Sequence, residues 1–134
     1  MSDKNVVFVT GDVRGLAVFR RAYALSLVLH RASQSFPKSE QYGGLADQLR
    51  RASKSVCALL VEGRGRQPGS DIEFRRYVIM ATGSADEARL WCEYARDLDY
   101  IEPETATVWM SELSEIARML QGVAKHLSSL TPDS

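Results

Sequence analysis

The 134-residue chain lacks several features on which whole functional classes depend. No apolar run approaches the roughly 18 residues that span a bilayer, and Val6–Val9 is too short for the hydrophobic region of a secretory signal. Only two cysteines occur, Cys57 and Cys92, without C-x-x-C spacing. We therefore expect a soluble, cytosolic protein that binds no membrane, with two free thiols buried as small apolar side chains.

Histidine is equally scarce, which argues against a metal centre. Bundles that bind two metal ions carry Glu-x-x-His on two helices, but Leu27 stands three residues before His30 and Val123 stands three before His126. Neither cysteine has a histidine in its own predicted helix to serve as a base. We expect no catalytic residue, no metal and no cofactor.

The stretch Glu62–Arg66, Glu-Gly-Arg-Gly-Arg, contains the glycines of a phosphate loop. No predicted strand precedes it and no Gly-Lys-Ser/Thr follows, as a phosphate-binding loop would require. Its main interpretation is a helix that ends at Gly63 and Gly65, with Glu62 capping or bracing the glycine turn. A phosphate held by the arginines beside the glycines is the alternative.

What the chain does contain is helical periodicity, with apolar residues at alternating spacings of four and three. The first predicted helix covers about 16–36 and is stopped by Pro37. The second begins between residues 39 and 45 and ends near residue 62. Their apolar stripes are, in order, Val18, Ala22, Leu25, Leu29, Ala32 and Phe36, then Leu45, Leu49, Ala52, Val56 and Leu59.

Two further helices have clear start signals. Ser70–Glu73 forms a capping box, in which serine and glutamate satisfy each other's free backbone N–H groups. Pro103 suits the first position of the fourth helix, with Glu102 and Glu104 near its positive end. Their stripes are Phe74, Tyr77, Ala81, Ser84, Ala88, Trp91, Ala95 and Leu98, then Trp109, Leu113, Ile116, Leu120, Val123, Leu127 and Leu130.

This pattern predicts an all-α, antiparallel, up-down-up-down four-helix bundle. A repeat of four and three keeps one seam of each helix against its neighbours, and short connections make successive helices antiparallel. The expected domain organisation is a flexible N-terminal lead over 1–15, with a short extended piece at Val6–Thr10, a bundle over 16–130 and a tail over 131–134.

Charge is unevenly distributed although the formal net charge is zero. Residues 1–70 carry 11 Lys and Arg against 5 Asp and Glu, and residues 71–134 carry 6 against 12. This favours attraction between the first and second pairs of helices, or a basic face for phosphate and an acidic face for another partner. The most concentrated basic set is the candidate nucleic-acid or partner contact Arg50, Arg51, Lys54, Arg64 and Arg66. Three interpretations of these side chains stay open. They are solvated, or they pair with carboxylates of a facing helix, or they bind a ligand such as an RNA phosphate.

Counting residues outward from a turn near 66–67 brings position 50 level with position 83 and position 46 level with Glu87. We therefore predict that Glu87 pairs with Arg50 or Arg51 across the second and third helices. The same count keeps the two cysteines too far apart for a disulfide. Gly83, beside several small residues, predicts a close approach by another helix, either within the bundle or across a subunit interface.

The second and third helices resemble the "four helix bundle protein" family, which includes proteins encoded in intervening sequences of bacterial 23S ribosomal RNA genes. The likeness lies in Leu45-x-x-Gln-Leu-Arg-Arg-Ala-x-x-Ser-Val56, Glu62-Gly-x-Gly-Arg66, Phe74, Tyr77, Gly83-Ser84, Glu87 and Asp97-Leu-x-Tyr-Ile101. It extends from about Leu16 to Leu127. The resemblance implies a homopentamer with no attached enzymatic activity, and distant relatives are basic pentameric accessory proteins of diversity-generating retroelements. This chain departs from the family at Leu59, where asparagine is usual, and from the retroelement relatives in being neutral.

The leading hypothesis is thus a non-enzymatic, homo-oligomeric scaffold or interaction module in the cytoplasm. The alternative is an accessory protein that associates with RNA or a nucleic-acid enzyme through the second-helix arginines.

Overall fold

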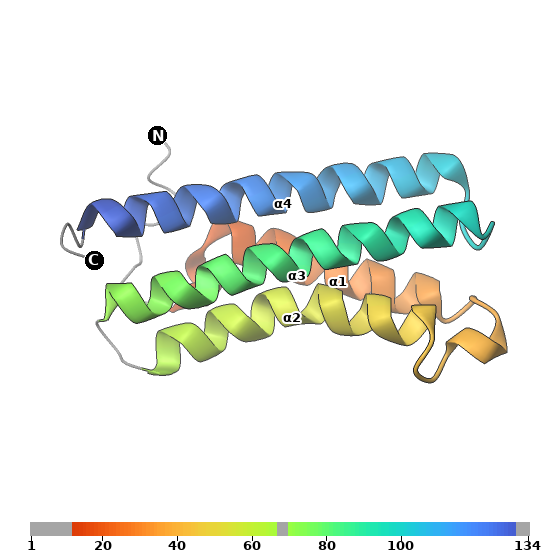
Figure 1. The fold of residues 1–134 in the computed structure, drawn as a ribbon, viewed down its shortest axis with the longest axis horizontal. Coiled ribbons are helices and arrows are strands. Elements are labelled where there is room, and N and C mark those ends of the chain that lie inside the picture. The colour runs from red at the N-terminus through yellow and green to blue at the C-terminus, as the bar shows by residue number, and fades with distance from the viewer. Residues whose placement is uncertain (1–11, 67–69, 131–134) are drawn as a thin grey trace.

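Four long helices pack side by side (Figure 1). The computed structural model describes residues 12–66 and 70–130. Its elements are η2 (Val13–Gly15), α1 (Ala17–Ser33), η3 (Lys38–Glu40), α2 (Leu45–Arg66), α3 (Asp71–Asp97) and α4 (Pro103–Leu130), where η marks a short 3-10 helix. Successive long helices run in opposite directions, as the colour order in Figure 1 shows. The predicted four-helix bundle is confirmed.

The start signals of α3 and α4 lie where predicted, but among the described residues only the serine half of the capping box forms. Ser70 is the N-cap of α3, and its hydroxyl accepts a hydrogen bond from the backbone N–H of Glu73 at 3.2 Å. The Glu73 carboxylate accepts from Arg76 at 3.0 Å. Pro103 is the first residue of α4. Helix α1 ends at Ser33, earlier than predicted, although Phe36 is still buried from the following connection.

The core follows most of the predicted seams, except that Ala32 and Leu59 are only half-buried and that α3 is rotated. In α4 the buried residues include the predicted Trp109, Leu113, Ile116, Leu120, Val123 and Leu127, whereas Leu130 is exposed. In α3 the buried line is Phe74, Val78, Ala81, Ala85, Ala88, Cys92 and Ala95. The predicted α3 positions Tyr77, Ser84 and Trp91 are only half-buried. The core face of α3 is therefore turned toward Val78, Ala85 and Cys92.

Gly63 does not end the second helix, which corrects the sequence interpretation. Helix α2 continues through Gly63 and Gly65 to Arg66. A Cβ atom at Gly63 would lie 2.4 Å from Cβ of Tyr77, closer than real Cβ contacts come. The residue is glycine because α2 and α3 approach each other here without room for a side chain.

Gly83 is in the opposite situation. It is exposed, and an added Cβ atom would meet nothing within 4 Å. The close approach predicted at Gly83 therefore does not occur within the described bundle, which leaves the subunit-interface interpretation.

The described fold begins before the predicted boundary at residue 16. Asp12 caps η2 by accepting a hydrogen bond from the Arg14 N–H at 3.0 Å, and Val13 is buried in the core. Residues 12–15, which we placed in the flexible lead, thus pack against the bundle. The predicted extended piece at Val6–Thr10 and the tail at 131–134 lie outside the described residues.

One end of the bundle is tied by contacts between two connections. The Glu40 carboxylate accepts from the Tyr100 hydroxyl at 2.7 Å and from the Leu45 N–H at 2.7 Å. These hydrogen bonds lower the pKa of Glu40, the backbone bond most, and the contact with Glu40 raises the pKa of Tyr100. Phe36 packs against the Tyr100 ring with centroids 5.4 Å apart. The α1–α2 connection is thereby attached to the α3–α4 connection.

The four pairs of neighbouring helices differ in how extensively they pack against each other. The α2–α3 and α3–α4 pairs pack along most of their length, whereas α1 packs less on α2 and least on α4. The side of the bundle between α1 and α4 is therefore open.

Candidate partner-binding surfaces

Arg50 is half-buried and holds the α1–α2 connection. Its guanidinium donates to the Ser33 hydroxyl at 2.8 Å and to the backbone carbonyl of Gln41 at 3.0 Å. Ser33 ends α1, and Gln41 lies just before α2. Arg50 is thus engaged by its own chain, through hydroxyl and carbonyl oxygens rather than the carboxylate that the sequence predicted.

The other α2 cations differ in environment. Arg51 is exposed and lies 3.1 Å from Asp47, one helical turn earlier. Lys54 is exposed and forms no ion pair within the part of the chain that the structure describes. The Arg66 side chain lies outside that part. Arg51 and Lys54 are therefore the predicted contact residues that face solvent.

Arg64 is buried between α2 and α3. Its guanidinium carbon lies 4.2 Å from the centroid of the Phe74 ring, and a terminal nitrogen lies 3.7 Å from Asp71. Its side chain is 12% exposed, and burial lowers the pKa of the guanidinium despite the neighbouring carboxylate. Arg64 joins two helices. The described members of the predicted cluster do not form one exposed surface, which corrects the idea that they act together.

The predicted pair between Glu87 and Arg50 or Arg51 is wrong. Glu87 is exposed, and its carboxylate accepts from the Trp91 indole N–H at 3.1 Å. The registry also differs, because the hydroxyls of Ser55 and Ser84 lie 2.9 Å apart across α2 and α3. Arg50 lies five residues before Ser55 on α2. Because the two helices are antiparallel, Arg50 is level with the residue five positions after Ser84, which is position 89 rather than 83. Helix α2 continues to Arg66, so the real turn lies later than the predicted one.

The remaining residues singled out from the sequence are Glu62 and the two cysteines. Glu62 lies on the exposed face of α2, inside the helix and not at a glycine turn. Cys57 and Cys92 are buried and free, as predicted. Burial raises the pKa of Cys57 to about 11 and that of Cys92 to about 12. Thiols with such pKa values stay protonated and react slowly.

His30 lies among cations on the α1–α2 side. Burial is the main cause that lowers the pKa of the His30 imidazole, and the positive charges of Lys54, Arg50 and Arg31 lower it further. Within residues 12–66 and 70–130 no three His, Cys, Asp or Glu side chains gather in a way that could hold a metal ion. Nor is any described helix long and apolar enough to cross a membrane.

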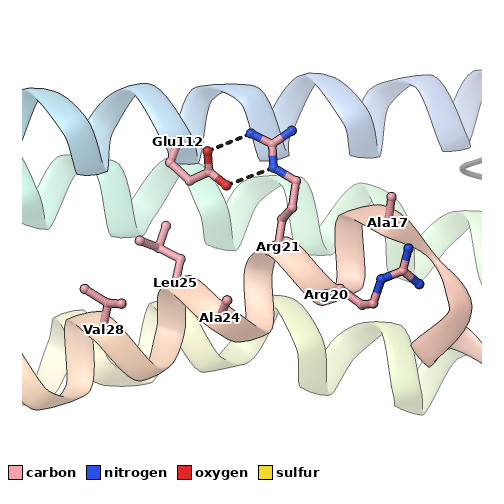
Figure 2. A pocket seen from close by; sticks show the side chains of 7 residues that line it. All are labelled: Ala17, Arg20, Arg21, Ala24, Leu25, Val28 and Glu112. Atoms are coloured by element: carbon pink, nitrogen blue, oxygen red, sulfur yellow. Dashed lines mark hydrogen bonds and ion pairs between the residues drawn. The ribbon is translucent and has the colours of Figure 1, made fainter.

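The sequence analysis missed the ion pair that bridges the open side of the bundle. Arg21 of α1 donates to both carboxylate oxygens of Glu112 in α4, at 2.9 and 2.6 Å (Figure 2). These hydrogen bonds raise the pKa of Arg21. The one available signal was charge, since α1 contains arginines and no acidic residue while α4 contains glutamates. Apolar side chains of Leu25 and Val28 lie beside the pair and line a hollow with it.

The outer face of α3 carries several exposed apolar side chains. Leucine, isoleucine, methionine and tyrosine side chains on it are 43–51% exposed. They recur along the helix at heptad-like spacings and surround the bare position Gly83. The members are Ile72, Ile79, Met80, Leu90 and Tyr94.

The fold and these surfaces define an all-helical bundle whose partly buried arginines join helices and whose exposed apolar residues form an organised stripe. A family model described as 23S rRNA-intervening sequence protein matches residues 14–122, from η2 to most of α4. The chain belongs to the family of 23S rRNA-intervening sequence proteins, as the resemblance in α2 and α3 indicated. A search of curated protein sequences finds no match.

Proposed function

We propose that this protein is a non-enzymatic scaffold or interaction module of the cytoplasm that works as a homo-oligomer, with five subunits as the expected number. The observation that carries this proposal is the exposed apolar stripe on α3. Exposed apolar side chains that gather on one helix face mark an interaction site more often than scattered ones do, because their contact with water is unfavourable. Association of copies would bury it.

Gly83 supports the same proposal. Glycine inside a helix costs about 1 kcal/mol relative to alanine, and no contact within the described bundle requires it here. A requirement from outside the subunit, such as the close approach of another helix, explains why a glycine stands in the middle of the stripe.

The environment of the reactive groups supports a role without catalysis. Both thiols are buried and have raised pKa values, which opposes the thiolate needed for nucleophilic attack. Arg50, Arg64 and Arg21 each contact a neighbouring part of the same chain.

Light scattering at micromolar concentration tests the proposal directly. We expect a mass several times 14.9 kDa, near five times that value. A monomer at all concentrations would contradict it.

A second candidate, an accessory protein for RNA or a nucleic-acid enzyme, rests on the α1–α2 side. Arg31 and Lys54 are exposed there and form no ion pair among the described residues, and together with Arg50 they lower the pKa of His30. Such a positive surface attracts phosphate groups.

Binding of a single-stranded RNA oligonucleotide, followed over a range of salt concentrations, tests this candidate. Replacing Arg31 and Lys54 by alanine should weaken binding and reduce the slope of log affinity against log salt by roughly one to two. Lys125→Ala, at an exposed position on α4, is the control. Equal effects from the control would show that the α1–α2 side is not the binding surface.

A further inference from the structure

A continuous groove runs along the open side between α1 and α4. Two adjoining hollows of about 470 and 540 Å³ form it, and they share Leu25, Val28 and Glu112. Figure 2 shows the side chains that line the first of them. The walls are mainly apolar, and Val108 of α4 is 65% exposed beside it. We call this the α1–α4 groove, and its lining is Ala17, Arg20, Arg21, Ala24, Leu25, Val28, Thr107, Val108, Trp109, Ser111 and Glu112.

A complementary feature lies on α3. Ile72, Ile79, Gly83, Leu90 and Tyr94 are seven, four, seven and four residues apart, so they form one straight line along the outer face. This line, with Met80 beside it, is the α3 ridge. From Ile72 to Tyr94 it extends over about 33 Å at 1.5 Å per residue, long enough for a helix-in-groove contact.

Charge favours a contact between the α3 ridge and the α1 wall of the groove. Helix α1 contains three arginines and no acidic residue, whereas α3 contains six acidic residues against four arginines. Asp86 and Glu87 flank the ridge and are exposed, and Arg20 in the lining of the groove is exposed as well. A ridge meeting a second ridge would bring the same acidic residues together, which is unfavourable.

Contacts within the subunit give the relative levels of the helices. Arg75 Nε donates to the carbonyl of Ala124 at 3.0 Å, which puts these residues at one level of α3 and α4. Because the helices are antiparallel, Trp91 is level with Val108, each sixteen residues from that contact. Val28 of α1 lines the same hollow as Val108. Val28, Val108 and Trp91 therefore lie within about one helical turn of the same level.

When copies are related by rotation about an axis along the bundle, every residue keeps its level from copy to copy. Helix α3 runs in the same direction as α1 (Figure 1). Leu90 of one copy then meets Val28 of the next, and Gly83 faces the stretch between Ala17 and Ala24. Gly83 thus comes level with Arg20 of the groove, where the bare position leaves room for that long side chain, and large apolar residues oppose each other where the groove is apolar.

We propose that the α3 ridge of one copy lies in the α1–α4 groove of a second copy. This inference rests on the proposed homo-oligomer and names its interface. The two surfaces differ, so the contact is heterologous: each subunit uses one surface for each neighbour, and copies related by rotation without translation close into a ring.

Cross-linking between single-cysteine substitutions tests the contact. Val28→Cys and Leu90→Cys alter side chains that are 45% and 44% exposed, so the subunit fold should tolerate them. Co-expressed variants treated with a short bifunctional maleimide should give covalent dimers, whereas either variant alone should give none. The native Cys57 and Cys92, buried and of raised pKa, provide an unreactive background.

Other outcomes separate the interface from the oligomer itself. Cross-linking of Leu90→Cys alone would mean that ridges pair with ridges, which overturns the heterologous contact. Absence of cross-links in a protein that light scattering shows to be oligomeric would also overturn it, while the proposed homo-oligomer would stand. A monomer by light scattering would overturn both.

Disruption by charge gives an independent test. Leu90→Asp should raise the dissociation constant of the assembly by roughly 100-fold, because a carboxylate would be buried in an apolar groove. Val61→Asp is the matched control, since Val61 is 43% exposed on α2, outside both surfaces. Circular dichroism should show that both variants keep their helices. Equal dissociation of the two variants, or none of Leu90→Asp, would contradict the proposal.

Discussion

The closed side of the bundle, between α2 and α3, contrasts with the open side between α1 and α4. On the closed side Gly63 lies directly against Tyr77, and Ser55 and Ser84 meet at 2.9 Å. On the open side the long arm of Arg21 reaches Glu112, and Val28 remains exposed. Both sides are built from helices with the same apolar periodicity. Small residues at the crossing therefore decide whether a seam closes against its own chain or stays available to another.

The largest effect should come from filling the closed side. Gly63→Ala places a methyl group 2.4 Å from Tyr77 Cβ, which belongs to the rigid part of that side chain. We expect destabilisation of about 1–3 kcal/mol from overpacking, in spite of the better helix propensity of alanine. Chemical denaturation measures the free energy of unfolding.

Gly83→Ala is the matched control, because an added Cβ there meets nothing within 4 Å. Under conditions that keep the protein monomeric it should stabilise the fold by about 0.5–1 kcal/mol. Opposite signs at the two glycines would support the comparison. Equal stabilisation at both would show that α2 and α3 do not approach closely at Gly63.

A smaller, pH-dependent effect should follow from Glu40, whose carboxylate joins the α1–α2 connection to the α3–α4 connection at one end of the bundle. Its folded-state pKa is lowered by hydrogen bonds from Leu45 and Tyr100, so the unfolded chain takes up a proton first as the pH falls. This contribution to stability is complete above the ordinary carboxyl pKa near 4.5 and is lost as pH falls through the lower folded value. Glu40→Gln should flatten the acid limb of stability against pH.

Thermal unfolding from pH 3 to 7 measures this limb, and Glu104→Gln, at an exposed position in the first turn of α4, serves as the control. An acid limb unchanged by Glu40→Gln would show that the tie at this end is not formed in solution.

The smallest effect should come from the open side. Arg21 and Glu112 have side chains 40% and 31% exposed, so replacing Arg21 by methionine should cost about 1 kcal/mol or less. Salt should reduce that loss by screening the pair. Urea denaturation at low and high salt measures it. A loss as large as that of Gly63→Ala would mean that the ion pair, rather than a partner surface, holds this side together.

Much of the fold was predictable because its causes are local. Apolar residues three and four positions apart define one face of a helix, and the predicted seam of α4 from Trp109 to Leu127 is buried. Ser70 and Pro103 mark helix starts through their own backbone chemistry. The candidate surfaces were less predictable. Gly63 and Gly65 have the form of a helix end, yet the helix passes through both.

By itself, then, the sequence determined four helices, their antiparallel order and the burial of both thiols, since these depend on periodicity and connection length. The tertiary structure decided which glycine allows contact, that Arg50 holds Ser33, and that the ridge and the groove stay uncovered within the subunit. Those outcomes depend on the distance and rotation between helix axes. They are set by packing among side chains distant in the sequence, which no local pattern records.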